Sequence, residues 1–205
     1  MKRFGRAILP LGITALLAMG CQQAGEPTAP FAARTIDVPD SPLRSSGSGK
    51  EDTLRLLKRT ISIKSKLSIS KVIGPEGGEI ILSGTGAKVI FPAGAVQKAK
   101  KITMTARAGN EIVYDFEPHM VFPVPVTIVQ ELEATNALGN NKILGSLQGG
   151  YFDGEFERNL VDDVRRLVKC KEVLPGLLAP DGRKFSFKVT HFSGYLASSG
   201  RSSDE

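Results

Sequence analysis

Apolar and polar side chains alternate along most of the chain after about residue 60. In ISIKSKLSI, the side chains of Ile61, Ile63, Leu67 and Ile69 share one face of an extended chain, and lysines and serines occupy the other. Successive residues of a strand point to opposite faces, so this period of two predicts a half-buried β-strand. The turn residues of GPEGG, at 74–78, then end the pattern.

Further short apolar runs follow, separated by clusters of Gly, Pro, Asn and Asp. They are EIIL, AKVIF, KITMTA, EIVYDF, VTIVQEL, KILGSL and KFSFKV. Many short strands at close spacing are typical of an antiparallel β-sandwich. We therefore predict an all-β fold, an antiparallel sandwich over residues 61–199, with residues 200–205 as a disordered tail.

One stretch departs from this period. In NLVDDVRRLV the apolar residues recur at three- and four-residue intervals, and Asn159 is a suitable helix cap. This spacing predicts one short helix, although a strand through residues 164–173 is also compatible with it.

The beginning of the chain has a different character. Lys2, Arg3 and Arg6 precede the apolar run AILPLGITALLAMG, which is too short and too interrupted by proline and glycine to span a bilayer permanently. We predict an export signal over residues 1–20. Residues 21–60 are predicted to be a disordered linker, since they begin with a stretch poor in large apolar side chains, with at most a short helical turn in EDTLRLLKRT.

The export signal ends in LLAMGC, which resembles the lipobox of bacterial lipoproteins, with Ala18 where leucine is usual. The resemblance implies that Cys21 is acylated and that the preceding peptide is removed. Two or three acyl chains anchor a protein firmly, whereas one binds marginally. We expect a lipid-anchored protein of the bacterial envelope. Gln22 favours the outer membrane, because it replaces the aspartate that retains enteric lipoproteins at the inner membrane. A plain secretory signal with a chance cysteine is the alternative.

The chain contains only one other cysteine. If Cys21 carries lipid, Cys170 has no partner and the domain has no internal disulfide; a Cys21–Cys170 bridge is the competing account. Val168 and Cys170 share a side of an extended LVKCKEV, which favours a buried, inert thiol over a reactive one.

Charge does not indicate a nucleic-acid partner. Three of the 27 Lys and Arg precede Cys21 and none of the 21 acidic residues does, so the net charge of +6 falls to +3 after removal of the signal. The remaining excess is local, in residues 50–71. A solvated linker and strand face is the simpler interpretation of it, and contact with anionic lipid head groups is the alternative.

VIGPEGGEI, AKVIFPAGAV and KITMTA together resemble the ZU-five domain, a β-sandwich module of ankyrins, netrin receptors and death-domain adaptors. The resemblance depends mainly on Gly77 and Gly78, followed about a dozen residues later by an apolar strand that ends in Pro92. YDFEPHMVFPVPVTI and THFSGY are similar to segments of bacterial secreted relatives. The match covers about residues 70–130 and 185–197, and the segment between them depends on periodicity alone.

Two features predict irregular strands. Pro123 and Pro125 bracket one valine, which suits an edge or bulged position because proline has no N–H to donate. In KFSFKVTHFSGYLA the apolar residues change from odd to even positions after Val189, which predicts a one-residue bulge near Thr190 and His191.

The family resemblance also implies a catalytic hypothesis. Some ZU-five proteins cleave themselves within a His-Phe-Ser sequence. By this resemblance His191 would be the general base and Ser193 the nucleophile, and the carbonyl of Phe192 the target of an N-to-O acyl shift followed by hydrolysis. Only 13 residues follow that bond, however, whereas self-cleaving relatives continue into a further domain. A closing strand is the preferred interpretation.

No other constellation predicts chemistry. His119 is the only other imidazole, and no cluster has the spacing of a zinc site. Asp153 indicates a turn, and Asp162 and Asp163 a helix start, rather than a calcium site. We expect no metal, cofactor, nucleic acid or small-molecule substrate.

The preferred function is a non-catalytic interaction or structural module, anchored in the membrane by lipid, with an envelope protein or the cell wall as partner. The alternatives are an autoproteolytic sandwich that cleaves between Phe192 and Ser193, and a cell-wall polysaccharide binder.

Overall fold

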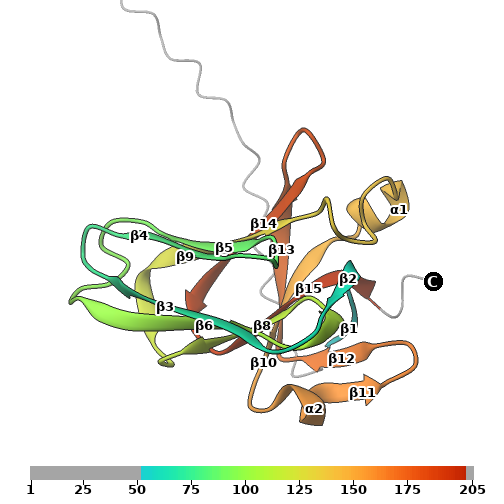
Figure 1. Ribbon diagram of the computed structural model, residues 1–205, viewed down its shortest axis with the longest axis horizontal. Helices are drawn as coiled ribbons and strands as arrows, with labels where there is room; N and C mark the ends of the chain where they lie inside the picture. The colour runs from blue at the N-terminus through green and yellow to red at the C-terminus, as the bar shows by residue number, and fades with distance from the viewer. Residues whose placement is uncertain (1–51, 202–205) are drawn as a thin grey trace, which may run out of the picture. The chain divides into compact units, whose positions relative to one another are not determined.

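The computed structural model describes residues 52–201, and these form an all-β domain of antiparallel strands. The strands form two layers that pack face to face (Figure 1). The first layer contains, in spatial order, β4 (Gly78–Leu82), β5 (Ala87–Phe91), β9 (Val121–Glu131), β14 (Lys184–His191) and β13 (Glu172–Leu178). The second contains β3 (Leu67–Ile73), β6 (Lys100–Ala106), β8 (Val113–Glu117), β15 (Gly194–Arg201) and β10 (Gln148–Phe152). The predicted antiparallel all-β sandwich is confirmed.

Smaller elements extend this sandwich. β1 pairs with β15 and is followed by two further strands along the same edge, whereas β2 and β7 form a separate pair. These strands are β1 (Asp52–Leu56), β12 (Leu167–Cys170), β11 (Leu160–Asp162), β2 (Lys58–Ile63) and β7 (Gly109–Glu111). The two helices are single turns, α1 (Asn141–Leu144) and α2 (Phe156–Asn159).

One strand joins the two layers. The first half of β13 pairs with β10 in the second layer, and residues 176–178 pair with β14 in the first. The change occurs at Gly176, where a Cβ atom would lie 2.0 Å from the ring of Phe185. A glycine is therefore required for the close approach of strand and ring.

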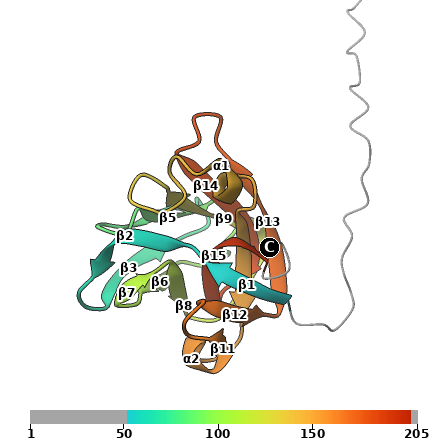
Figure 2. The ribbon, with the colours of Figure 1, turned by 90° about the vertical axis from the view of Figure 1, so that its right-hand side faces the viewer.

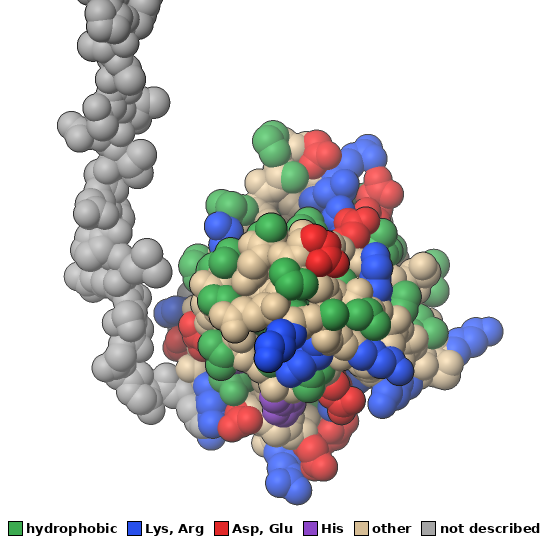
Figure 3. All heavy atoms as spheres, turned by 90° about the vertical axis from the view of Figure 1, so that its left-hand side faces the viewer, with side chains coloured by type: hydrophobic (Ala, Val, Ile, Leu, Met, Phe, Trp, Pro, Cys, Tyr) green, Lys and Arg blue, Asp and Glu red, His purple; other side chains and the backbone are tan. Residues whose placement is uncertain are grey.

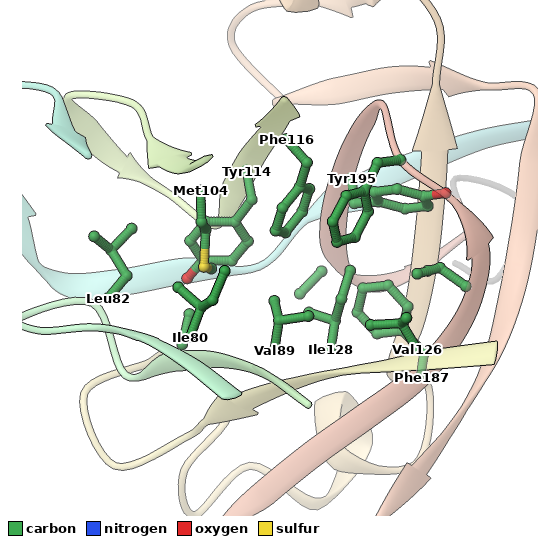
Figure 4. Close-up of a cluster of buried hydrophobic side chains, with 14 of the residues drawn as sticks. Ile80, Leu82, Val89, Met104, Tyr114, Phe116, Val126, Ile128, Phe187 and Tyr195 are labelled. Carbon is green, nitrogen blue, oxygen red and sulfur yellow. The ribbon is translucent and has the colours of Figure 1, made fainter. Parts of the chain in front are cut away.

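The main core lies between the layers. Figure 4 shows side chains of both layers facing each other across it. Ile80, Val89 and Ile128 come from the first layer and Met104 and Phe116 from the second, and all are at most 1% exposed. The period of two in these strands thus places one apolar face of each layer inside.

A second core packs on the other side of β15, where β1, β12 and α2 cover it. Its buried members are Leu54, Leu56, Val113, Phe152, Phe156, Val168, Cys170 and Leu196. The domain therefore begins at least nine residues before the predicted boundary. The prediction that residues 52–60 are linker or a helical turn is wrong, because they form β1 and the first half of β2.

The predicted face of ISIKSKLSI is also wrong. Ile61 is 77% exposed and Ile69 is 37% exposed, although Ile63 is buried. The stretch is not one strand, because the chain bends between β2 and β3. The period of two identifies residues that share a face only where the strand is continuous.

The helix predicted after Asn159 does not form. α2 ends at Asn159, and β11 and β12 follow, joined by a tight turn in which Arg166 has a φ of 56°. KILGSL, predicted as a strand, contains α1, which Asn140 caps by accepting a hydrogen bond from the backbone N–H of Ile143. In NLVDDVRRLV, the apolar residues of two short strands joined by a turn happen to recur at the spacing of a helix, and this produced the wrong prediction.

The predicted irregularity at Pro123 and Pro125 is confirmed. The register between β14 and β9 shifts between Val189 and His191, but β14 advances two residues there while β9 advances five, from Val121 to Val126. The extra residues therefore lie in β9, and the prediction of a one-residue bulge at Thr190 and His191 places the irregularity on the wrong strand. Pro123 and Pro125 lie in this bulged part of β9, which has no partner in β5, because the pairing of β5 with β9 spans residues 127–130. The predicted start of the tail at residue 200 is wrong, since β15 continues to Arg201, and residues 202–205 lie outside the described range.

Within the described range, no helix is both long and apolar enough to cross a membrane. The predicted export signal, Cys21 and the linker up to residue 51 lie outside the described residues.

Candidate functional site

The His-Phe-Ser sequence forms the corner at which the chain passes from one layer to the other. β14 ends at His191 and β15 begins at Gly194, so the predicted closing strand is two strands. Backbone hydrogen bonds fix the corner: the N–H of Phe192 donates to Met120 O at 2.7 Å, and that of Phe116 donates to Ser193 O at 3.1 Å. The shift in apolar phase therefore marks a change of layer as well as a register shift against β9.

The ring of Phe192 holds this corner in the core. It is 2% exposed and stacks on Phe116 with ring centroids 4.5 Å apart. The rings of Phe91 and Phe122 form T-shaped pairs with it, with ring centroids 5.8 and 4.6 Å away. Such aromatic contacts stabilise beyond the buried area alone, so the corner is a well-packed part of the structure.

His191 points to a tyrosine cluster. The hydroxyl of Tyr195 donates to the backbone oxygen of His191 at 2.6 Å and lies 3.1 Å from its Nδ1. Nε2 lies 3.9 Å from Glu172 Oε2, and the ring meets that of Tyr151 edge-on at 4.5 Å. Burial raises the pKa of Tyr195, so its hydroxyl keeps its proton at neutral pH.

Ser193 lies in a different environment. It borders a polar hollow of about 300 Å³ whose lining also includes His119, Asp115 and Glu117, but not His191. Across residues 52–201, neither imidazole forms a hydrogen bond with the Ser193 hydroxyl. His191 and Ser193, the predicted base and nucleophile, are thus close in the sequence but do not form a hydrogen bond in the structure. General-base catalysis requires such contact.

Cys170 is a free thiol in the second core. It is 1% exposed, and its Sγ lies 3.9 Å from the backbone oxygen of Val168. Burial, with a smaller effect of the Asp52 charge, raises the pKa of the Cys170 thiol to about 12. The predicted burial of this thiol is confirmed, and since the thiolate is the reactive form, the raised pKa favours an unreactive thiol.

The three singled-out aspartates serve local structure. Asp153 pairs with Lys171 at 2.7 Å, which lowers the pKa of its carboxyl group. Asp162 does not start a helix but ends β11, and it accepts a hydrogen bond from the Arg165 N–H at 2.8 Å. Asp163 pairs with Arg166. In the part of the chain that the structure describes, no group of three or more acidic, His or Cys residues could hold a metal.

A buried polar network was missed by sequence reasoning. Arg59, which belongs to the predicted linker, donates to the hydroxyl of Tyr114 at 2.8 Å. That hydroxyl donates to Gln130 Oε1 at 2.6 Å, and the Gln130 amide donates to Thr85 O at 3.1 Å. These four residues come from β2, β8, β9 and the turn between β4 and β5, and all are at most 5% exposed. The alternation of Leu54 and Leu56 with Arg55 was the available sign that this segment is folded.

The surface has no dominant sign of charge on the face that Figure 3 shows. Basic, acidic and apolar side chains are interspersed there, in keeping with the nearly balanced numbers of basic and acidic residues in the sequence. This face gives no electrostatic argument for a polyanionic partner.

Comparison of the chain with protein-family models and with curated proteins gave no match in either case.

Proposed function

We propose that the chain is a lipid-anchored protein of the bacterial cell envelope, whose sandwich is a non-catalytic interaction or structural module. The observation that supports the module role is that the side chains of the His-Phe-Ser corner, between β14 and β15, are engaged in packing. His191 contacts the tyrosine cluster and Phe192 is stacked in the core, so both contribute to packing between the layers. The anchor is supported by the charged start, the short apolar run and LLAMGC.

The proposal includes the ZU-five resemblance. The two sequence segments that carry it pack against each other, since Gly78 pairs with Phe91 and the N–H of Gly94 donates to Pro75 O at 2.7 Å. Gly77, with a φ of 80°, is at the turn where the segments meet. This packing gives a physical reason for the residue pattern and supports a ZU-five-like domain.

Acyl labelling tests the anchor. Cells that produce the full chain and grow with an alkyne-tagged fatty acid are expected to yield labelled protein in the membrane fraction. Cys21→Ser is expected to reduce the label to background, because the acyl groups are proposed to depend on this sulfur. Cys170→Ser is the matched control and is expected to leave the label unchanged. Label that persists in Cys21→Ser would contradict the anchor.

Intact mass tests the non-catalytic role. The purified chain is expected to show no loss of residues 193–205, because His191 bonds to Tyr195 rather than to the Ser193 hydroxyl. Ser193→Ala is expected to have an equally intact C-terminus. A wild-type chain that is cut between Phe192 and Ser193, together with an intact Ser193→Ala variant, would establish the autoproteolytic alternative instead.

A further inference from the structure

Arg59 is a buried arginine at one end of the sandwich, and most of its donors are unused. It is 5% exposed, and it donates to the backbone oxygen of Glu111 and to the hydroxyl of Tyr114. Its Nε is buried and has no acceptor among the described residues. A guanidinium group has five N–H donors. The two observed hydrogen bonds therefore leave much of this group unsatisfied.

The charge of Arg59 is unpaired as well. Considering residues 52–201, no carboxylate lies within 4.0 Å of its nitrogens. Glu111 directs its carboxylate to Arg166, and Glu133 pairs with Arg183 at 2.6 Å. Glu111 and Glu133 are thus paired with other arginines, and among the described residues Glu131, the remaining acid of this region, forms no ion pair with Arg59.

Tyr114 does not supply the missing negative charge. Burial raises the pKa of its hydroxyl above the ordinary value of 10.0, although the Arg59 charge acts in the opposite direction. The phenol is therefore neutral at physiological pH, and its ring offers Arg59 only a cation–π contact at 5.6 Å. A charge removed from water without a partner is strongly unfavourable, so this environment favours a bound anion.

A hollow of about 610 Å³ adjoins Arg59. It lies where β2 crosses the end of the sandwich, between β2, residues 64–67, the turn at residues 84–86 and the end of β9 (Figure 2). Part of its lining is apolar, from Ile61, Ile63 and Leu67, and Ile61 is 77% exposed. Its polar lining includes Arg59 and Gln130, and charged residues of both signs, Lys64, Glu131 and Glu133, also border it. The hollow thus combines a cation with an apolar wall.

We propose that this hollow binds a small carboxylate with a short apolar chain. The carboxylate is the counter-charge of Arg59, and the chain lies against the isoleucines of β2. Carboxylates match guanidinium groups well because charge and hydrogen bonding act together. The site does not depend on the anchor or on the module role, so a failure of acyl labelling would leave it untouched.

Titration of the wild-type chain tests the site directly. Hexanoate and N-acetyl-leucine carry the required carboxylate, on an alkyl chain and beside an amide respectively, and hexan-1-ol is the uncharged control. The Nε–H resonance of Arg59, followed by nitrogen-15 NMR, is expected to shift and saturate with a carboxylate and to remain unchanged with hexan-1-ol. A response to hexanoate alone identifies a fatty-acid type of ligand, and one to N-acetyl-leucine alone a peptide-like carboxylate.

A pair of variants tests the role of the charge. Arg59→Gln is expected to weaken binding of the responding carboxylate by about ten-fold or more, because it removes a charge-assisted contact. Arg158→Gln is the matched control, since it removes an exposed arginine that pairs with Glu155 and does not line the hollow. It is expected to leave the affinity unchanged. No response to either carboxylate, an equal response to hexan-1-ol, or equal affinities of wild type and Arg59→Gln would overturn the proposal. If Arg59→Gln does not fold, the wild-type titration decides.

Discussion

Gly77→Ala is expected to lower the free energy of unfolding by about 2–5 kcal/mol. Two effects add at this position. A residue with a side chain at a φ of 80° costs roughly 1–2 kcal/mol, and the new Cβ atom would lie 2.3 Å from Phe91 O and 2.8 Å from the carbonyl carbon of Pro92. These contacts are backbone atoms at the junction of β4 and β5, so relief requires the strands to separate, at a further cost of about 1–3 kcal/mol.

Gly139→Ala is the matched control for this prediction. Gly139 has a φ of 76°, nearly that of Gly77, but its Cβ would meet no atom within 4 Å. It is expected to cost only the conformational part, about 1–2 kcal/mol. Urea unfolding followed by far-ultraviolet circular dichroism measures both, because the chain has no tryptophan for fluorescence. If both variants lose the same free energy of unfolding, the backbone of β5 does not restrict the space at Gly77.

Sequence periodicity predicted the strands that have one buried face and continuous pairing. In β5 and β14 the alternate residues Val89, Phe91, Phe185 and Phe187 are all buried, as a period of two requires. A register shift near His191 was predictable from the change in apolar phase after Val189, although the extra residues lie in β9 and not at Thr190. The contacts of the His191 side chain were not predictable, since they involve Tyr195 and Glu172, which lie on other strands.

The errors have physical causes. Arg166 adopts a φ of 56°, which residues other than glycine rarely take, so nothing in its identity marked the turn that replaced the predicted helix. The segment around Arg59 contains many basic residues and follows a proline-rich stretch, which together suggested a linker. Burial of Arg59 depends on long-range contacts with Glu111 and Tyr114, and these have no local pattern in the sequence.

Leu54→Ala is expected to lower the free energy of unfolding by about 2–5 kcal/mol, the usual cost of a large cavity in a core. Leu54 is fully buried in β1, and its Cδ1 lies so close to Gly150 that a Cβ there would meet it at 2.9 Å. β1 also pairs with both β12 and β15, so loosening it exposes the second core from two sides.

Ile61→Ala completes this test of the domain boundary. The sequence pattern places Leu54 in a linker and Ile61 in the core, whereas the structure reverses their roles, with Ile61 77% exposed. Removal of an exposed side chain changes stability by about 0.5 kcal/mol or less, and both substitutions delete similar apolar groups. Urea unfolding of the full chain should therefore separate the two variants clearly. A large loss for Ile61→Ala with none for Leu54→Ala would mean that the sandwich begins at β2 or later, and that β1 contributes nothing to the folded domain.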